Sequence, residues 1–176
     1  MSNNSNDWMA TPIPEILDRL ASDHEWMREN LPQLWHFMEK VQEVHGEHHP
    51  EFFKLAEVVG PMFQDLESHM HKEENILFPM LRKMTDPNWD GDVASCGGCA
   101  PGPAGPMARM QIEHGMANDA LAKCRTIAMD YNLPSDACKA YTTLYQGLAK
   151  LETLISEHTQ IQEQAVHPRI TELAAQ

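Results

Sequence analysis

The sequence carries the stretch HMHKEENILFP at residues 69–79, in which Glu73 follows His69 by four positions. Residues four apart lie on one face of an α-helix, one turn from each other. A second stretch, HTQIQEQAVHP at residues 158–168, aligns with the first, and each has a proline ten residues after its first histidine. The chain therefore repeats a helical hairpin at an offset of about 90 residues, with the richer motif on the second helix of each hairpin.

Apolar residues recur at helical spacing in four runs, at residues 13–41, 52–80, 107–128 and 141–165. Pro32 lies inside the first run, and because the apolar stripe continues in phase beyond it, we expect a kinked but unbroken helix. Residues 46–50 and the segment around Pro134 are typical of turns. No segment alternates apolar and polar residues as a strand would. The sequence therefore predicts an all-α fold, an up-down-up-down antiparallel four-helix bundle.

Two segments depart from the helical pattern. Residues 85–106 are rich in glycine and proline and contain Cys96 and Cys99, which predicts a long loop. Loops of this length in a compact domain are functional or disordered. Residues 1–11 are polar, and we expect a disordered N-terminal tail there. The bundle domain is then expected to span residues 12–172.

Each predicted helix has one histidine on its apolar stripe. These histidines are His24, His69, His114 and His158, spaced by 45, 45 and 44 residues. In an up-down bundle, residues on consecutive helices lie at one height only if the turn between them is midway. The midpoints fall at Gly46–Glu47, near Gly91 and at residues 134–136, where the sequence predicts connections. We therefore expect the four imidazoles to meet at one level of the core.

A metal ion would explain four histidines at one level. Unpaired polar groups in an apolar core cost on the order of a few kcal/mol each, so four together need a shared ligand. Glu73 adds a carboxylate on the same helix face as His69. Imidazole and carboxylate groups from facing helices are the ligand set of di-iron sites in helical bundles. The sequence therefore predicts a metal site in the core of the bundle.

The chain is acidic, with 13 Lys and Arg against 26 Asp and Glu and a formal net charge of −13. This charge disfavours nucleic acid and anionic membrane surfaces as partners, because both would repel it. No apolar run approaches the roughly 20 residues that span a bilayer, and residues 1–8 lack the features of an export signal. We expect a cytoplasmic protein that binds neither nucleic acid nor membranes, with its cysteines reduced.

The sequence resembles the hemerythrin-like (HHE cation-binding) family, and most closely its repair-of-iron-centres branch, over residues 12–172. The specific part of this resemblance is residues 68–80, supported by three shorter motifs, Val44-His45-Gly46, Glu113-His114, and Glu157-His158 leading to Pro168-Arg169. In that family a four-helix bundle holds a non-haem di-iron site of four histidines and two bridging glutamates. The branch typically also carries a small N-terminal domain with paired cysteines, for which the residues before Pro12 leave no room.

The resemblance implies a set of metal ligands in this chain. Carried over by position, they are His24, His69, Glu73, His114, His158 and position 162. Position 162 is Gln, and a neutral amide bridges two irons less well than a carboxylate. Glu163 lies at the longer spacing of the oxygen-carrying hemerythrins, but it needs a π-bulge or an inward reach to become a ligand. Without Glu163, the site holds either one iron with an open position or two irons with the second bound weakly. Whether the centre is mono-iron or di-iron, and oxo-bridged or not, stays open.

The resemblance also implies a function. It implies a protein that answers nitrosative or oxidative stress by handling iron, either repairing iron–sulfur clusters or reacting with NO or O₂ at its reduced site. Its partners would be O₂ or NO and iron–sulfur proteins, and neither the oligomeric state nor an enzymatic activity follows. Oxygen carriage is disfavoured, because oxygen carriers have a second histidine where this chain has Asn118. Two other classes stay open: a gas or metal sensor that acts through the 85–106 loop, and a bundle that stores Fe or Zn.

Several other side chains have two interpretations each. Cys96 and Cys99 form a CxxC pair that is either a redox pair, a set of metal-binding thiolates, or part of a loop with no role. Three glutamates adjoin predicted ligands and either orient imidazole N–H groups or are solvated surface charges. They are Glu25, Glu113 and Glu157.

The six remaining histidines are not expected in the core site. The group His45, His48 and His49 lies in the first predicted turn and forms at most a weak metal cluster. The others, His36, His71 and His167, are expected to be partly exposed. Cys124 lies on an apolar stripe, where we expect it to contribute packing rather than chemistry.

Overall fold

The structure is a computed structural model that describes residues 8–89 and 102–175. Within those ranges it contains helices and no strand. The long helices are α1 (Ile13–His45), α2 (Glu51–Lys72), α4 (Ala104–Ile127) and α5 (Lys139–Ile161). The short elements are η1 (Glu73–Leu77), α3 (Phe78–Met84), η2 (Met129–Tyr131), η3 (Gln162–Val166) and α6 (His167–Ala174).

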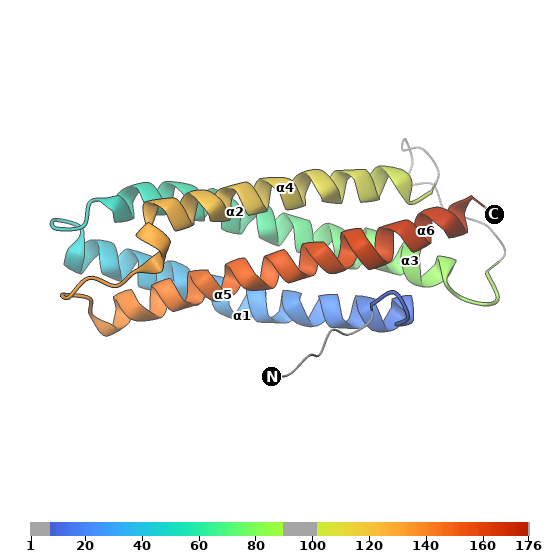
Figure 1. The fold of residues 1–176 in the computed structure, drawn as a ribbon, viewed down its shortest axis with the longest axis horizontal. Coiled ribbons are helices and arrows are strands. Elements are labelled where there is room, and N and C mark those ends of the chain that lie inside the picture. Colours follow the sequence, from blue (N-terminus) through green and yellow to red (C-terminus); the bar gives the residue numbers. More distant parts are fainter. Residues whose placement is uncertain (1–7, 90–101, 176) are drawn as a thin grey trace.

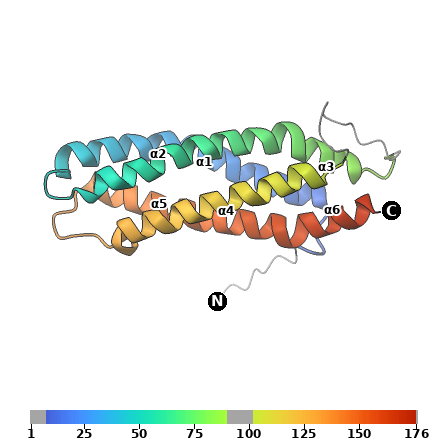
Figure 2. The ribbon, with the colours of Figure 1, turned by 90° about the horizontal axis from the view of Figure 1, so that it is seen from above.

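These elements form four rods that run alternately up and down (Figure 1). The π-helical segment η1 joins α2 to α3 without a break, and η3 joins α5 to α6 in the same way. Helix α1 packs against α2 and α5, and α4 packs against the same two helices on the opposite side. The second view shows the same four-sided arrangement (Figure 2). The predicted up-down-up-down antiparallel four-helix bundle is confirmed.

Proline and glycine positions explain where the helices bend and end. Helix α1 continues through Pro32, as predicted, and stops at His45, where the backbone N–H of Gly46 donates to the carbonyl of Gln42. Pro79 and Pro168 each come directly after a π-helical segment, as the second residue of α3 and of α6. A proline lacks an N–H and clashes with the carbonyl four residues earlier, and the wider π-helical turn relieves both problems.

The connection between α3 and α4 is shorter than the predicted loop. Helix α4 begins at Ala104, so Gly105 and Pro106 belong to its first turn, where a missing N–H costs nothing. Cys96 and Cys99 lie outside the described residues. In the predicted N-terminal tail, residues 8–11 are described, and the Arg169 guanidinium donates hydrogen bonds to the carbonyls of Trp8 and Thr11.

The interior consists of two apolar clusters with a polar layer between them. One cluster lies toward the α1–α2 and α4–α5 turns and includes Phe52 and Leu148. The other lies toward the opposite end and includes Leu17 and Ile170. Each fully buried large apolar side chain contributes about 1.5–3 kcal/mol to folding. Among the described helices, none combines the length and the apolar character that a membrane span requires.

Candidate metal centre

The layer between the two apolar clusters contains the four histidines predicted to share one level. They come one from each rod: His24 from α1, His69 from α2, His114 from α4 and His158 from α5. Each is at most 5% exposed, and the side chain of Glu73 at the start of η1 is fully buried among them. The midpoint argument placed these residues correctly because both short turns lie where it required.

The Glu73 carboxylate is shared between two pairs of histidines. Its Oε1 atom lies 3.3 Å from Nε2 of His69 and 3.8 Å from Nε2 of His114. Its Oε2 atom lies 3.0 Å from Nε2 of His24 and 3.3 Å from Nε2 of His158. Each carboxylate oxygen therefore faces its own pair of imidazoles.

The imidazole rings are grouped in the same two pairs. The ring centroids of His69 and His114 are 4.9 Å apart, and those of His24 and His158 are 5.1 Å apart. Phe78 stacks on His24 with a centroid distance of 5.6 Å and an interplanar angle of 7°. Packing of this kind limits rotation of the rings and holds the inner nitrogens toward Glu73.

A carboxylate stands behind each imidazole, on the side away from Glu73. His24 Nδ1 is 2.9 Å from Glu74, His69 Nδ1 is 3.1 Å from Glu113, and His158 Nδ1 is 3.3 Å from Asp23. His114 Nδ1 lies 3.9 Å from an oxygen of Glu163, beyond hydrogen-bond range. Carboxylates that accept from the outer N–H fix the orientation and tautomer of metal-binding histidines.

These four outer carboxylates connect the helices in a closed ring. Asp23 on α1 faces the histidine of α5, and the Glu74 of η1 faces the histidine of α1. Glu113 on α4 faces the histidine of α2, and Glu163 of η3 faces the histidine of α4. Every rod thus supports the imidazole of a neighbouring rod, which links the rotation of each helix to the next.

Two of the three outer carboxylates expected from sequence were wrong. Glu25 and Glu157 are exposed at the surface, and Glu113 alone occupies an outer position. The repeat contained the missing signal, because Asp23 matches Glu113 and Glu74 matches Glu163 in the two halves, whereas Glu25 matches a glycine. Acidic residues that recur at equivalent positions of both hairpins were the better indication.

Gln162, and not Glu163, projects into the centre. The Gln162 amide nitrogen is 2.5 Å from Oε1 of Glu73 and 2.9 Å from Nε2 of His158, and the residue is 1% exposed. The π-helical segment considered for Glu163 does exist, but it begins at Gln162 and leaves the Glu163 side chain 41% exposed. A second π-helical segment, η1, begins at Glu73, which the sequence analysis missed.

The protonation equilibria of the centre are governed by burial and by Glu73. Burial alone would raise the pKa of Glu73, but the four imidazoles outweigh it and lower that pKa well below its usual range. Burial also opposes charge on His158, yet its hydrogen bonds to Asp23 and Glu73 raise its pKa to about 9. For His114 burial prevails and lowers the pKa. Without metal, the negative charge of Glu73 is balanced mainly by a proton on His158.

The donor set fits a metal centre. Among the described residues, several buried atoms here have no hydrogen-bond partner: Nε2 of His24, both ring nitrogens of His114 and Oε1 of Gln162. Leaving such atoms unpaired costs about 1–3 kcal/mol each. Imidazole nitrogens and carboxylate oxygens are ligands of divalent transition metals, which would satisfy these atoms.

The remaining sequence predictions divide in the same way. His36 and His71 have exposed side chains, as expected. Cys124 is buried, and burial raises the pKa of its thiol to about 12, which agrees with a packing role. His167 was expected to be partly exposed, but it is only 4% exposed. It occupies the repeat position of Phe78, so the second half carries a histidine where the first half has an apolar ring.

Comparisons with known proteins agree with this architecture. Residues 15–170 match the family described as the hemerythrin HHE cation binding domain. An iron-sulfur cluster repair protein YtfE from Cronobacter sakazakii is 30% identical over 164 residues, which cover 93% of this chain and 68% of the relative. The YtfE of Salmonella schwarzengrund is 28% identical over the same shares. The YtfE of Edwardsiella ictaluri is 31% identical over 115 residues, 65% of this chain and 46% of the relative. The chain therefore spans about half the length of several curated relatives that it matches.

The buried His167 predicts a pH-dependent cost of stability. Neither of its ring nitrogens has a hydrogen-bond partner, and burial lowers its pKa to about 4 from an ordinary value of 6.5. Below pH 6.5 the unfolded chain takes up a proton that the folded protein excludes, which costs about 2 kcal/mol at pH 5 and nothing at pH 8. We expect His167→Phe to raise the melting temperature relative to wild type by about 4–8 °C more at pH 5 than at pH 8. An equal difference at both pH values would contradict this account.

Proposed function

The chain belongs to the hemerythrin HHE cation-binding family, and from this premise we propose that its bundle, residues 12–172, holds two non-haem irons in the core. We propose further that the protein handles iron under nitrosative or oxidative stress, with the repair of iron–sulfur clusters as its function. The relatives that are named for such repair support this assignment. Their greater length makes the activity and the client proteins part of the proposal.

The observation that carries the proposal is the position of Glu73 between two pairs of histidines. One oxygen with His69 and His114 would hold one iron, and the other oxygen with His24 and His158 would hold the second. A carboxylate that offers one oxygen to each of two ligand pairs is suited to bridge two ions. Iron bound by these groups in its reduced state would offer an open position to a diatomic such as NO or O₂.

Gln162 supports a role in supplying iron rather than in storing it permanently. Two divalent ions bring four positive charges, and Glu73 is the single carboxylate among the inner groups of the described centre. A second carboxylate at position 162 would neutralise one more charge, whereas an amide neutralises none. The second iron is therefore held weakly, which allows its transfer to a damaged cluster.

Small ligands have a route to the centre between α2 and α4. A cavity of about 480 Å³ opens there, and its wall includes His69, His114 and His158. Lys72 and Arg109 also line it and bind the outer carboxylate Glu113. The chain's own residues thus bind the metal, orient the imidazoles and leave one side of an otherwise apolar core accessible.

Replacing Glu73 tests the assignment of the ligands. We expect Glu73→Ala to reduce bound iron at least fivefold and to lower the melting temperature, because metal that binds the folded state stabilises it. Glu157→Ala is the matched control, since that carboxylate adjoins His158 but is exposed. Iron per chain is measured by elemental analysis after purification without added metal. Unchanged iron content in Glu73→Ala would refute the assignment.

Replacing Gln162 tests why the second iron is labile. We expect Gln162→Glu to raise the iron content toward two per chain and to slow iron loss to a chelator about tenfold. Gln160→Glu adds the same charge at an exposed position of the same rod and should change neither quantity. If Gln162→Glu loses iron as fast as wild type, the missing charge does not control retention.

Cluster repair itself is tested with an iron–sulfur enzyme inactivated by NO or peroxide. Iron-loaded wild type should restore its activity, and Glu73→Ala loaded under the same conditions should not. A double variant, Cys96→Ser with Cys99→Ser, determines whether the cysteine pair contributes. A visible spectrum of aerobic protein distinguishes a ferric pair, which absorbs, from Zn²⁺, which does not. An iron-loaded protein that restores no activity would exclude repair and leave sensing or storage.

A further inference from the structure

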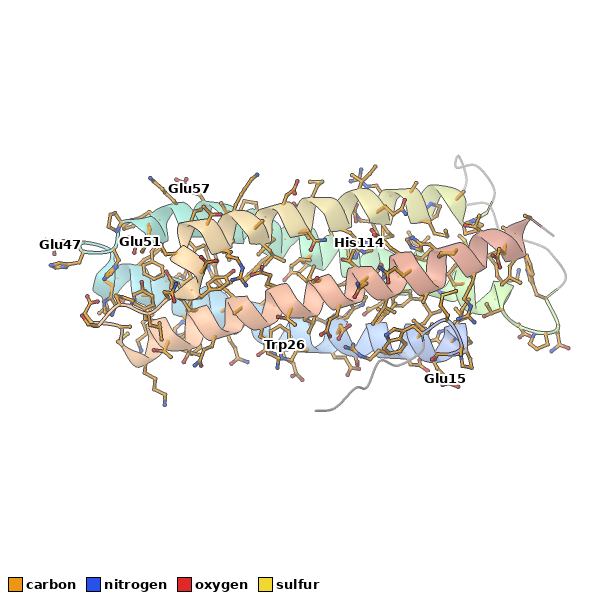
Figure 3. All side chains as sticks on the ribbon, viewed as in Figure 1. Glu15, Trp26, Glu47, Glu51, Glu57 and His114 are labelled. Carbon is orange, nitrogen blue, oxygen red and sulfur yellow. The ribbon has the colours of Figure 1, made fainter. Side chains whose placement is uncertain are left out.

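A second group of candidate metal ligands lies at the opposite end of the bundle from the centre described above. It consists of His45, the last residue of α1, His49 in the following turn, and Asp136 in the turn before α5. Figure 3 shows the neighbouring Glu47 and Glu51 at this end, away from His114. His45 is 21 residues beyond His24 on one helix, a separation of about 31 Å. No ion could contact both groups.

The distances within this group suit a small cation. One donor atom from each residue lies within 4.8 Å of the other two. His49 Nε2 is 3.1 Å and 3.3 Å from the two oxygens of Asp136. Zn²⁺ binds nitrogen and oxygen ligands at about 2.0–2.2 Å, which places neighbouring ligand atoms of a tetrahedral ion roughly 3.3–3.5 Å apart. The His49–Asp136 spacing already meets this requirement, and a small rotation brings in His45.

His45 contributes a nitrogen that the protein leaves unsatisfied. Its Nε2 atom is buried and has no hydrogen-bond partner among the described residues. Tyr141 forms the wall behind the group, with its ring centroid 5.6 Å from that of His45 and 5.6 Å from that of His49. Tyr141 is 1% exposed and so fixed by packing. The two imidazoles are therefore held next to each other before any ligand binds.

The surroundings of the group favour a positive ion. Nδ1 of His49 lies 2.9 Å from Oε1 of Glu51, an arrangement in which a carboxylate orients a metal-binding histidine from behind. The same arrangement occurs behind the histidines of the core centre. His45 also ends α1, and the C-terminal end of a helix dipole attracts cations.

We propose that His45, His49 and Asp136 form a second metal site, specific for a borderline divalent cation such as Zn²⁺, with water as the fourth ligand. Two imidazoles and one carboxylate match the ligand preferences of that ion. The bound ion joins the α1–α2 turn to the α4–α5 turn and thus ties the two helical hairpins together at the end that lacks the iron centre.

Zinc titration of the full, iron-loaded protein tests this site. We expect wild type to bind one Zn²⁺ per chain by calorimetry while its iron content stays constant. His49→Gln and Asp136→Asn should each weaken that binding at least tenfold. His48→Gln is the matched control, because His48 is an exposed histidine in the same turn and outside the group; it should bind as wild type does.

Thermal unfolding with and without Zn²⁺ gives a second measurement. The melting temperatures of wild type and His48→Gln should rise when zinc is added, and those of His49→Gln and Asp136→Asn should not. Circular dichroism verifies that each variant is folded, and Asp136→Asn alters a side chain that is 54% exposed. Equal zinc binding by all four proteins, an equal loss in the His48 control, or zinc uptake only with release of iron would each overturn the proposal.

Discussion

The carboxylate of Glu73 is the group around which the bundle is organised. A charge buried this completely is costly unless other groups compensate it, and here the compensation comes from imidazoles on four different rods. The apolar clusters on either side can pack in many registers, because apolar contacts are not directional. The contacts to Glu73 are directional, so they select the register in which His24, His69, His114 and His158 lie at one height.

The ring of outer carboxylates extends this constraint from height to rotation. Because Asp23, Glu74 and Glu113 each face the imidazole of another rod, a helix cannot turn about its axis without breaking contacts at two neighbours. The centre is thereby oriented by residues that would not themselves contact a metal. Cations such as Arg28 and Lys72 bind these carboxylates from outside and hold them in turn.

The two halves of the repeat have diverged at the positions that matter for chemistry. The first half has Glu73 and Phe78, a charge and an apolar ring, where the second half has Gln162 and His167, a neutral amide and a titratable ring. Both π-helical segments are kept, so the backbone geometry is shared while the charge is not. This asymmetry accounts for a core site in which one carboxylate serves both pairs of histidines.

Helical period, proline positions and histidine spacing in the chain were enough to predict the bundle, its turns and the meeting of four imidazoles with Glu73, because these features follow from local geometry. The partners of those groups could not be predicted in this way. Which acidic residue stands behind which imidazole depends on helix rotation, and His49 meets Asp136 across 87 positions of sequence. The burial of His167 and the inward direction of Gln162 depend on how η3 winds against its neighbours. Such contacts are set by packing between helices, which a linear pattern does not encode.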